Sequence, residues 1–146
     1  MMDMSKCIER FLEPQKTSYV IALEEVRNGR KVSHWMWYIF PQLRGLGQSN
    51  VAWYYGIEDL SEAKVYLAHP ILGQRLREIT QVALDLFEND PMKIFGWPDH
   101  MKFRSCMTLF AQASEDDLFT KALDKFFGGQ EDFMTLELLK QKGYKI

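Results

Sequence analysis

The sequence lacks the signals of several protein classes. Only two of its 146 residues are cysteines, Cys7 and Cys106, and no CxxC or Cys/His spacing indicates a zinc site or a disulfide framework. No apolar run approaches the roughly 20 residues that span a bilayer, and the charged N-terminal stretch has no apolar core of a signal peptide. These absences predict a cytoplasmic protein without a membrane partner.

The sequence also lacks a large excess of charge of either sign. The 18 basic and 20 acidic residues leave a net charge of −2, so the chain has no basic excess with which to bind a phosphate backbone. Nucleic acid is therefore disfavoured as a partner, although stacking of RNA bases on the tryptophans stays open. What the sequence does contain is 47% hydrophobic and 14% aromatic residues, which is typical of a globular domain and not of a disordered chain.

Apolar residues recur mainly three and four residues apart, which is helical spacing. Pro14 is expected to break a helix, while Ser33, Asp59, Ser114 and Asp132 are expected N-caps. We predict an all-α fold, a single compact multihelical domain (residues 1–146) of about seven to nine short helices packed orthogonally. The expected helices span residues 5–12, 14–28, 34–40, 50–55, 60–69, 71–87, 99–111, 115–127 and 133–140.

The segment 30–47, RKVSHWMWYIFPQLRGLG, is the most distinctive part of the chain. It holds four aromatic rings within residues 33–42 and has cations at both flanks, Arg30 and Lys31 before the rings and Arg44 after them. The aromatic content also suits a strand, but the run does not alternate, so a helix is preferred. Buried rings beside polar groups that need partners are typical of small-molecule pockets. We therefore predict a binding site on this segment.

Three residues are candidates for catalysis. The imidazole of His34 could act as a general base, and Gln42 and the carboxylate of Asp99 could orient ligand and water. A buried histidine bonded to a backbone carbonyl is the alternative for His34, as a helix cap is for Asp99. No histidine or carboxylate pair has metal-ligand spacing and no phosphate-loop motif occurs, so we predict no metal and no cofactor.

A second set of residues is predicted to hold the ligand. Cations would bind its anionic part, indole rings would stack on its planar part, and the glycine backbone and a polar helix face after Asp99 would complete the site. Each of these groups also has a purely structural alternative. The rings could pack in the core, the glycines could form a tight turn between helices, and the polar face could simply be solvated. The set is Arg30, Lys31, Trp35, Trp37, Arg44, Gly45, Gly47, Lys102 and Ser105.

Four stretches carry a family likeness: GRKVSHWMWYIFPQLRGLGQS, YGIEDLSEAKVYLAHPILGQRL, IFGWPDHMKFRSCMTLF and FFGGQEDFMTLELL. Together, and most of all through the motif GRKxSHWMWxIFPQLxGLG, they resemble a bacterial family of unknown function that is often mislabelled "calpastatin". The resemblance runs from about residue 11 to residue 139 and implies an all-helical fold, a cytoplasmic location and no established activity. One departure is Cys106, where the family typically has serine. The cysteine is either an altered nucleophile or a small buried residue.

Two hypotheses on function follow from these features. In the first, the chain binds an anionic nucleotide-like or ADP-ribose-like small molecule at a pocket on residues 33–47. If that site is catalytic, a likeness to small helical proteins of ADP-ribose metabolism indicates hydrolysis of an N-glycosidic bond. In the second, the aromatic segment is an exposed patch of a non-catalytic module that binds a partner protein or forms a homodimer.

Overall fold

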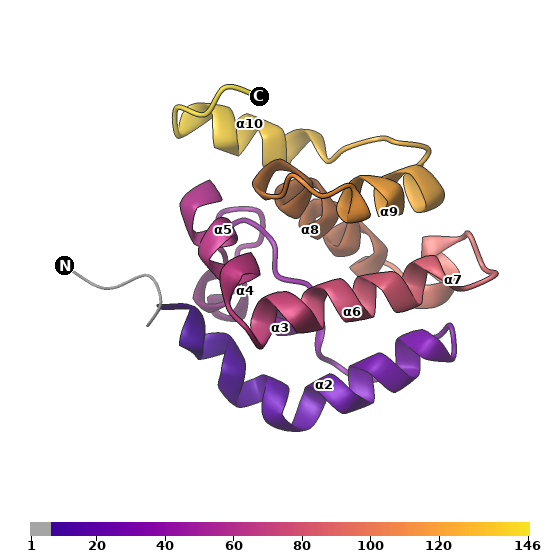
Figure 1. The fold of residues 1–146 in the computed structure, drawn as a ribbon. Helices are drawn as coiled ribbons and strands as arrows, with labels where there is room; N and C mark the ends of the chain where they lie inside the picture. The colour runs from indigo at the N-terminus through magenta and orange to yellow at the C-terminus, as the bar shows by residue number, and fades with distance from the viewer. Residues whose placement is uncertain (1–6) are drawn as a thin grey trace.

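The structure is a computed structural model, and it describes residues 7–146. Within these residues the fold is all-α, as predicted, and the one strand-like contact is an isolated parallel bridge between Leu43 and Ile57. Figure 1 shows the helices and their order along the chain. The elements are the 3-10 turn η1 (Ile8–Phe11) and the α-helices α2 (Leu12–Arg27), α3 (Met36–Ile39), α4 (Asn50–Tyr54), α5 (Leu60–Ala68), α6 (Leu72–Leu84), α7 (Pro91–Phe95), α8 (Asp99–Ala113), α9 (Leu118–Phe127) and α10 (Phe133–Gln141).

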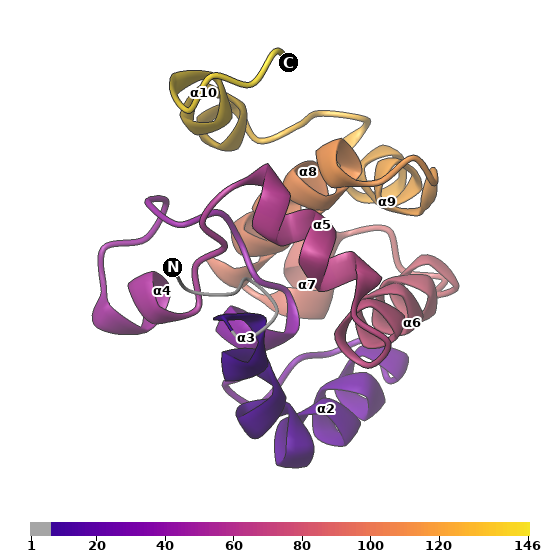
Figure 2. The ribbon, with the colours of Figure 1, turned by 60° about the vertical axis from the view of Figure 1, so that its left-hand side comes forward.

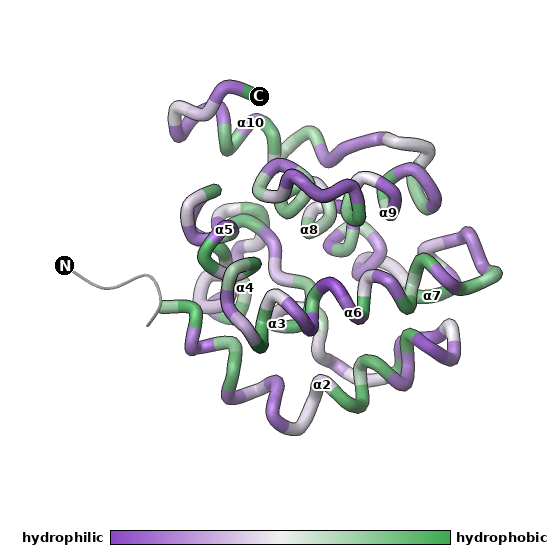
Figure 3. The backbone as a smooth tube through the Cα atoms, viewed as in Figure 1, coloured by the Kyte–Doolittle hydropathy of each residue, from purple (hydrophilic) through white to green (hydrophobic). Residues whose placement is uncertain are grey.

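Helix α8 is the central element of the fold. It contacts α5, α7, α9 and α10, while α6 packs against α2, α5 and α9. Figure 1 shows α6 between α2 on one side and α8 and α9 on the other, and Figure 2 shows α10 at one end of the molecule. Figure 3 shows hydrophobic and hydrophilic residues interleaved along the helices, as packing of one apolar face requires. The fully buried large side chains include Phe11, Trp35, Phe40, Tyr66, Phe103, Phe110 and Phe119.

The predicted helix break at Pro14 is wrong. Pro14 is the third residue of α2, and the N–H groups of the first turn have no acceptor within a helix, so proline costs no hydrogen bond there. The turn η1 therefore leads directly into a helix that reaches Arg27. The helix ends at Asn28, as predicted, and Gly29 follows with a positive φ of 76°. The first two residues of the helix expected over 5–12 lie outside the described residues.

Two of the four predicted N-caps are confirmed and two are wrong. The side chains of Asp59 and Asp132 each accept a hydrogen bond of 3.0 Å from the backbone N–H three residues later. Ser33 caps no helix, because its hydroxyl donates to Glu25, and the helix expected over 34–40 is shortened to α3. Ser114 instead follows the last residue of α8.

The helix expected over 71–87 ends earlier, at Leu84. The ammonium of Lys125 in α9 donates to the carbonyl oxygens of Ala83 and Leu84, at 3.4 and 2.8 Å, and also to that of Leu86. These are carbonyls that a longer helix would have bonded internally. Phe87 lies beyond this end and is fully exposed.

Candidate functional site

One carboxylate fixes the polar segment that precedes α3. Glu25 of α2 accepts hydrogen bonds from the backbone N–H groups of Val32 and Ser33, at 2.8 and 2.9 Å. It also accepts from the hydroxyl of Ser33 at 2.6 Å and from Nε1 of Trp35 at 2.9 Å. Burial opposes the ionisation of Glu25, but these hydrogen bonds outweigh it and lower its pKa to about 2. The segment is thereby tied to α2.

Two lysines and an aspartate form a charge cluster between this segment and α8. The ammonium of Lys31 lies 2.9 Å from Oδ2 of Asp99 and donates to the carbonyl of Ser33 at 2.6 Å. The ammonium of Lys102 lies 2.9 Å from Oδ1 of the same carboxylate. Burial raises the pKa of Asp99, but the two ammonium groups overcome it and hold that pKa below its usual value. The cluster keeps one unit of uncompensated positive charge beside the first turn of α8, whose dipole has the same sign.

Trp37 lies directly beside this cluster. The ammonium of Lys102 is 4.6 Å from the centre of its ring, within the range of a cation–π contact. Gly47 also lies close to the indole, since a Cβ there would lie 3.4 Å from Trp37 and 2.6 Å from the Cβ of Ala52. Trp37 is half-buried, whereas Trp35 is only 1% exposed and its N–H is already paired.

Two hollows adjoin at Trp37 and Lys102, and we call them together the groove. The basic hollow has a volume of about 180 Å³ and the apolar hollow about 260 Å³. The basic hollow is lined by Lys31, His34, Trp35, Met36, Trp37, Asp99 and Lys102. The apolar hollow is lined by Trp37, Gln42, Leu46, Gly47, Pro98, Met101, Lys102, Ser105, Asp132 and Met134.

The structure therefore brings most of the predicted site residues to one place. All three catalytic candidates line the groove, His34 and Asp99 in the basic hollow and Gln42 in the apolar one. His34 is exposed, so the alternative of a buried histidine does not apply. The ligand-binding candidates in the groove are Lys31, Trp35, Trp37, Gly47, Lys102 and Ser105.

Three predicted residues lie elsewhere. Arg44 is directed away from the groove, because its guanidinium pairs with Glu58 at 2.8 Å, donates to the carbonyl of Trp53 and stacks on that ring. Arg30 is exposed and lines neither hollow, and Gly45 lines neither hollow either. A cation close to the rings in sequence is thus not close to the site in space.

Other wall residues have no sequence signal that points to a site. Asp132 and Met134 come from the start of α10, and Asp132 is recognisable in the sequence only as a helix cap. Glu25 fixes the segment before α3, but in the sequence it is only one of several carboxylates on polar helix faces. Cys106 is fully buried and burial raises the pKa of its thiol well above the usual value, so it is a packing residue and not a nucleophile.

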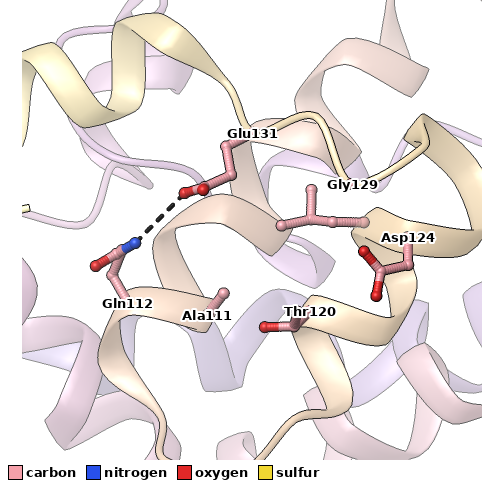
Figure 4. A pocket seen from close by; sticks show the side chains of 7 residues that line it. Ala111, Gln112, Thr120, Asp124, Gly129 and Glu131 are labelled. Atoms are coloured by element: carbon pink, nitrogen blue, oxygen red, sulfur yellow. Dashed lines mark hydrogen bonds between the residues drawn. The ribbon is translucent and has the colours of Figure 1, made fainter.

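A third hollow is less suited to an anionic ligand. Figure 4 shows it between α8, α9 and residues 128–131, with a volume of about 120 Å³, in which Gln112 donates to Glu131 at 3.4 Å. It has no cation and no aromatic ring, and its two charged residues, Asp124 and Glu131, are both acidic. Among residues 7–146, no helix is long and apolar enough to cross a membrane, and no group of three His, Cys, Asp or Glu side chains is placed to hold a metal ion.

Comparison with known proteins adds a family and a related fold. The family model described as "Protein of unknown function (DUF1810)" matches residues 5–139. The crystal structure of the conserved hypothetical protein Rv1873 from Mycobacterium tuberculosis is 46% identical in sequence and has a TM-score of 0.89. That similarity covers 91% of this chain and 96% of the other. No curated protein matches the sequence significantly.

Proposed function

The chain belongs to the DUF1810 family, whose function is unknown, and we propose a function from the geometry of the groove. The groove binds an anionic small molecule that has a planar ring, as a nucleotide has. The observation that carries this proposal is the contact of Lys102 with Trp37 at the wall shared by the two hollows. An ammonium group and an indole at one point suit a ligand that has a negative charge next to a ring.

The size of the groove supports a ligand that occupies both hollows. Small-molecule sites usually have volumes of about 300–1,000 Å³. Each hollow alone falls short of that range, at about 180 and 260 Å³, whereas the two together fall within it. A bipartite ligand would place its anion in the basic hollow and its ring in the apolar hollow, on either side of Trp37.

The charges of the basic hollow support an anion there. Asp99 neutralises one of the two lysines that flank it, and the second positive charge remains. Lys31 is largely buried, with its side chain 7% exposed, so it serves mainly to hold Asp99. Lys102 is more accessible and borders both hollows. We therefore assign the direct contact with the anion to Lys102.

The same geometry limits what catalysis could involve. Asp99 stays ionised because its pKa is lowered, so it could accept a hydrogen bond from water but could not donate a proton. His34 lines the same hollow and is exposed, which makes it the base that hydrolysis of an ADP-ribose-like ligand would use. Gln42 lines the other hollow and is assigned to binding.

The burial of the aromatic segment favours this proposal over an interaction module. Trp35, Met36, Ile39 and Phe40 are each no more than 3% exposed. A partner protein or a second copy of the chain would therefore meet little of the apolar surface of this segment.

The proposal is tested by isothermal titration calorimetry with inorganic pyrophosphate, AMP and ADP-ribose on the wild-type protein and on Lys102→Met. A hydrogen bond to a charged group contributes about 1.5–3 kcal/mol, so the substitution should weaken binding about 10- to 100-fold. Lys93→Met is the matched control, since Lys93 lies on α7 with its side chain 70% exposed. Equal binding by wild type and Lys102→Met, or no binding of any of the three ligands, would refute the proposal.

A further inference from the structure

The apolar hollow is lined by an amide that has no hydrogen-bond partner among residues 7–146. Gln42 is 7% exposed and lines this hollow, and its side chain makes no hydrogen bond to any of residues 7–146. The fully buried unpaired polar atoms of the described residues belong to Thr80, His100 and Arg104, so the amide atoms of Gln42 are accessible from the hollow. A side-chain amide has two donors and one acceptor. The donors and the acceptor of the Gln42 amide are unused within the protein, which indicates that they bind a ligand.

The other polar side chains of this hollow are of two kinds. Lys102 and the indole of Trp37 are donors, and Lys102 already donates to Asp99, whereas Ser105 and Asp132 offer acceptors. The hydroxyl of Ser105 donates its only proton to the carbonyl of Met101 at 3.1 Å, which leaves its lone pairs. Oδ2 of Asp132 accepts from the N–H and the hydroxyl of Thr135, at 3.0 and 2.6 Å. Oδ1 of Asp132 forms a long ion pair with Nη2 of Arg104, at 3.9 Å, and accepts no hydrogen bond from residues 7–146. A ligand group that contacts Ser105 and Asp132 must therefore donate hydrogen bonds to them.

The apolar part of the lining suits a flat ring. Trp37 stands on one side, and the flexible thioethers of Met101 and Met134 complete the wall. The indole provides a face or an edge for an aromatic heterocycle, and methionine side chains adapt to its outline.

We propose that the apolar hollow selects a heterocycle bearing an exocyclic amino group, as adenine, guanine and cytosine do. This inference rests on the proposed function, since the phosphate of such a nucleotide would lie in the basic hollow. The amide of Gln42 pairs with an edge that has a donor next to an acceptor, the geometry by which glutamine contacts adenine. The second N–H of the amino group is then available to Asp132 or to Ser105.

Calorimetry with matched ligands tests the selection. AMP is compared with purine riboside 5′-monophosphate, which lacks the amino group, and CMP with UMP, in which a carbonyl replaces it. Ribose 5-phosphate serves as the ligand without a base. A bidentate contact contributes about 1–3 kcal/mol of discrimination, so AMP and CMP should bind about 10-fold more tightly than their partners.

The outcomes separate this inference from the proposed function. If ribose 5-phosphate binds as tightly as AMP, or UMP as tightly as CMP, the amino selection is refuted while anion binding in the groove stands. If none of these ligands and no pyrophosphate binds, both proposals fail.

Two variants assign the selection to residues. Gln42→Met keeps the size of the side chain and should weaken AMP binding about 10-fold, with ribose 5-phosphate unchanged. Gln48→Met, an exposed residue outside both hollows, is the control. Asp132→Asn keeps a good N-cap for α10 but replaces an acceptor by a donor, so it should shift the preference from CMP towards UMP. An unchanged preference in both variants would overturn the inference.

Discussion

The carboxylate of Glu25 should make the stability of the fold depend on pH in an identifiable way. Its four hydrogen bonds hold residues 32–35 and lower its pKa from 4.5 to about 2. A shift of that size corresponds to about 3 kcal/mol, and solvent screening of a partly exposed group reduces it to about 1–2 kcal/mol. Because the folded-state pKa is the lower one, this stabilisation is complete above about pH 5.5 and is lost as the pH falls towards 2.

The assay is urea unfolding of the wild-type protein and of Glu25→Gln at several pH values between 7 and 3. At pH 7 the variant should be less stable by about 1–2 kcal/mol, because a glutamine amide cannot accept all four bonds. The difference between the two proteins should shrink as the pH is lowered. Taking this difference cancels the contribution of Asp99, whose pKa is also lowered and which is present in both proteins.

Glu24→Gln provides the matched control for Glu25→Gln. Glu24 is the neighbouring residue of α2, and its carboxylate makes only an exposed pair with Arg27 at 3.2 Å. Its replacement should change the free energy of unfolding by less than about 0.5 kcal/mol. A difference between wild type and Glu25→Gln that stays constant from pH 7 to pH 3 would refute the assignment of the low pKa to Glu25.

Two further substitutions test the packing and capping described above. Gly47→Ala should destabilise the fold by about 1–3 kcal/mol in urea unfolding, since the new methyl group would lie 2.6 Å from the Cβ of Ala52, and unchanged stability would contradict this close approach to Ala52. Asp59→Ala should cost about 1 kcal/mol through loss of the α5 N-cap while leaving ligand binding unchanged, so a loss of affinity as large as that of Lys102→Met would argue against the position of the site.

The helices could be predicted from the sequence because their signals are local. Apolar periodicity and capping residues act over three or four positions, and Asp59 and Asp132 are caps in the structure as in the prediction. The errors had separate causes. Pro14 stands in the first turn of α2, where it breaks no hydrogen bond, and Ser114 lies at the end of α8. Ser33 has the chemistry of a cap, yet its hydroxyl binds Glu25, eight residues earlier in the chain.

The candidate site could be predicted only for residues that are close to one another both in the sequence and in space. Trp37 and Lys31 lie in one segment and line one hollow. Arg44 is equally close in sequence, but Glu58 and Trp53 hold it on another surface. The wall formed by Asp132 depends on the docking of α10 against α8, and no local pattern contains that information.

The ammonium of Lys125 joins the dynamics of α6 to those of α9. A helix end usually frays at little cost, because water replaces the bonds of its last carbonyls. Here, opening the last turn of α6 would deprive a lysine 39 to 42 residues away of its carbonyl acceptors. We therefore expect the last turn of α6 and helix α9 to open together in hydrogen exchange, so that local opening would not follow the order of the chain.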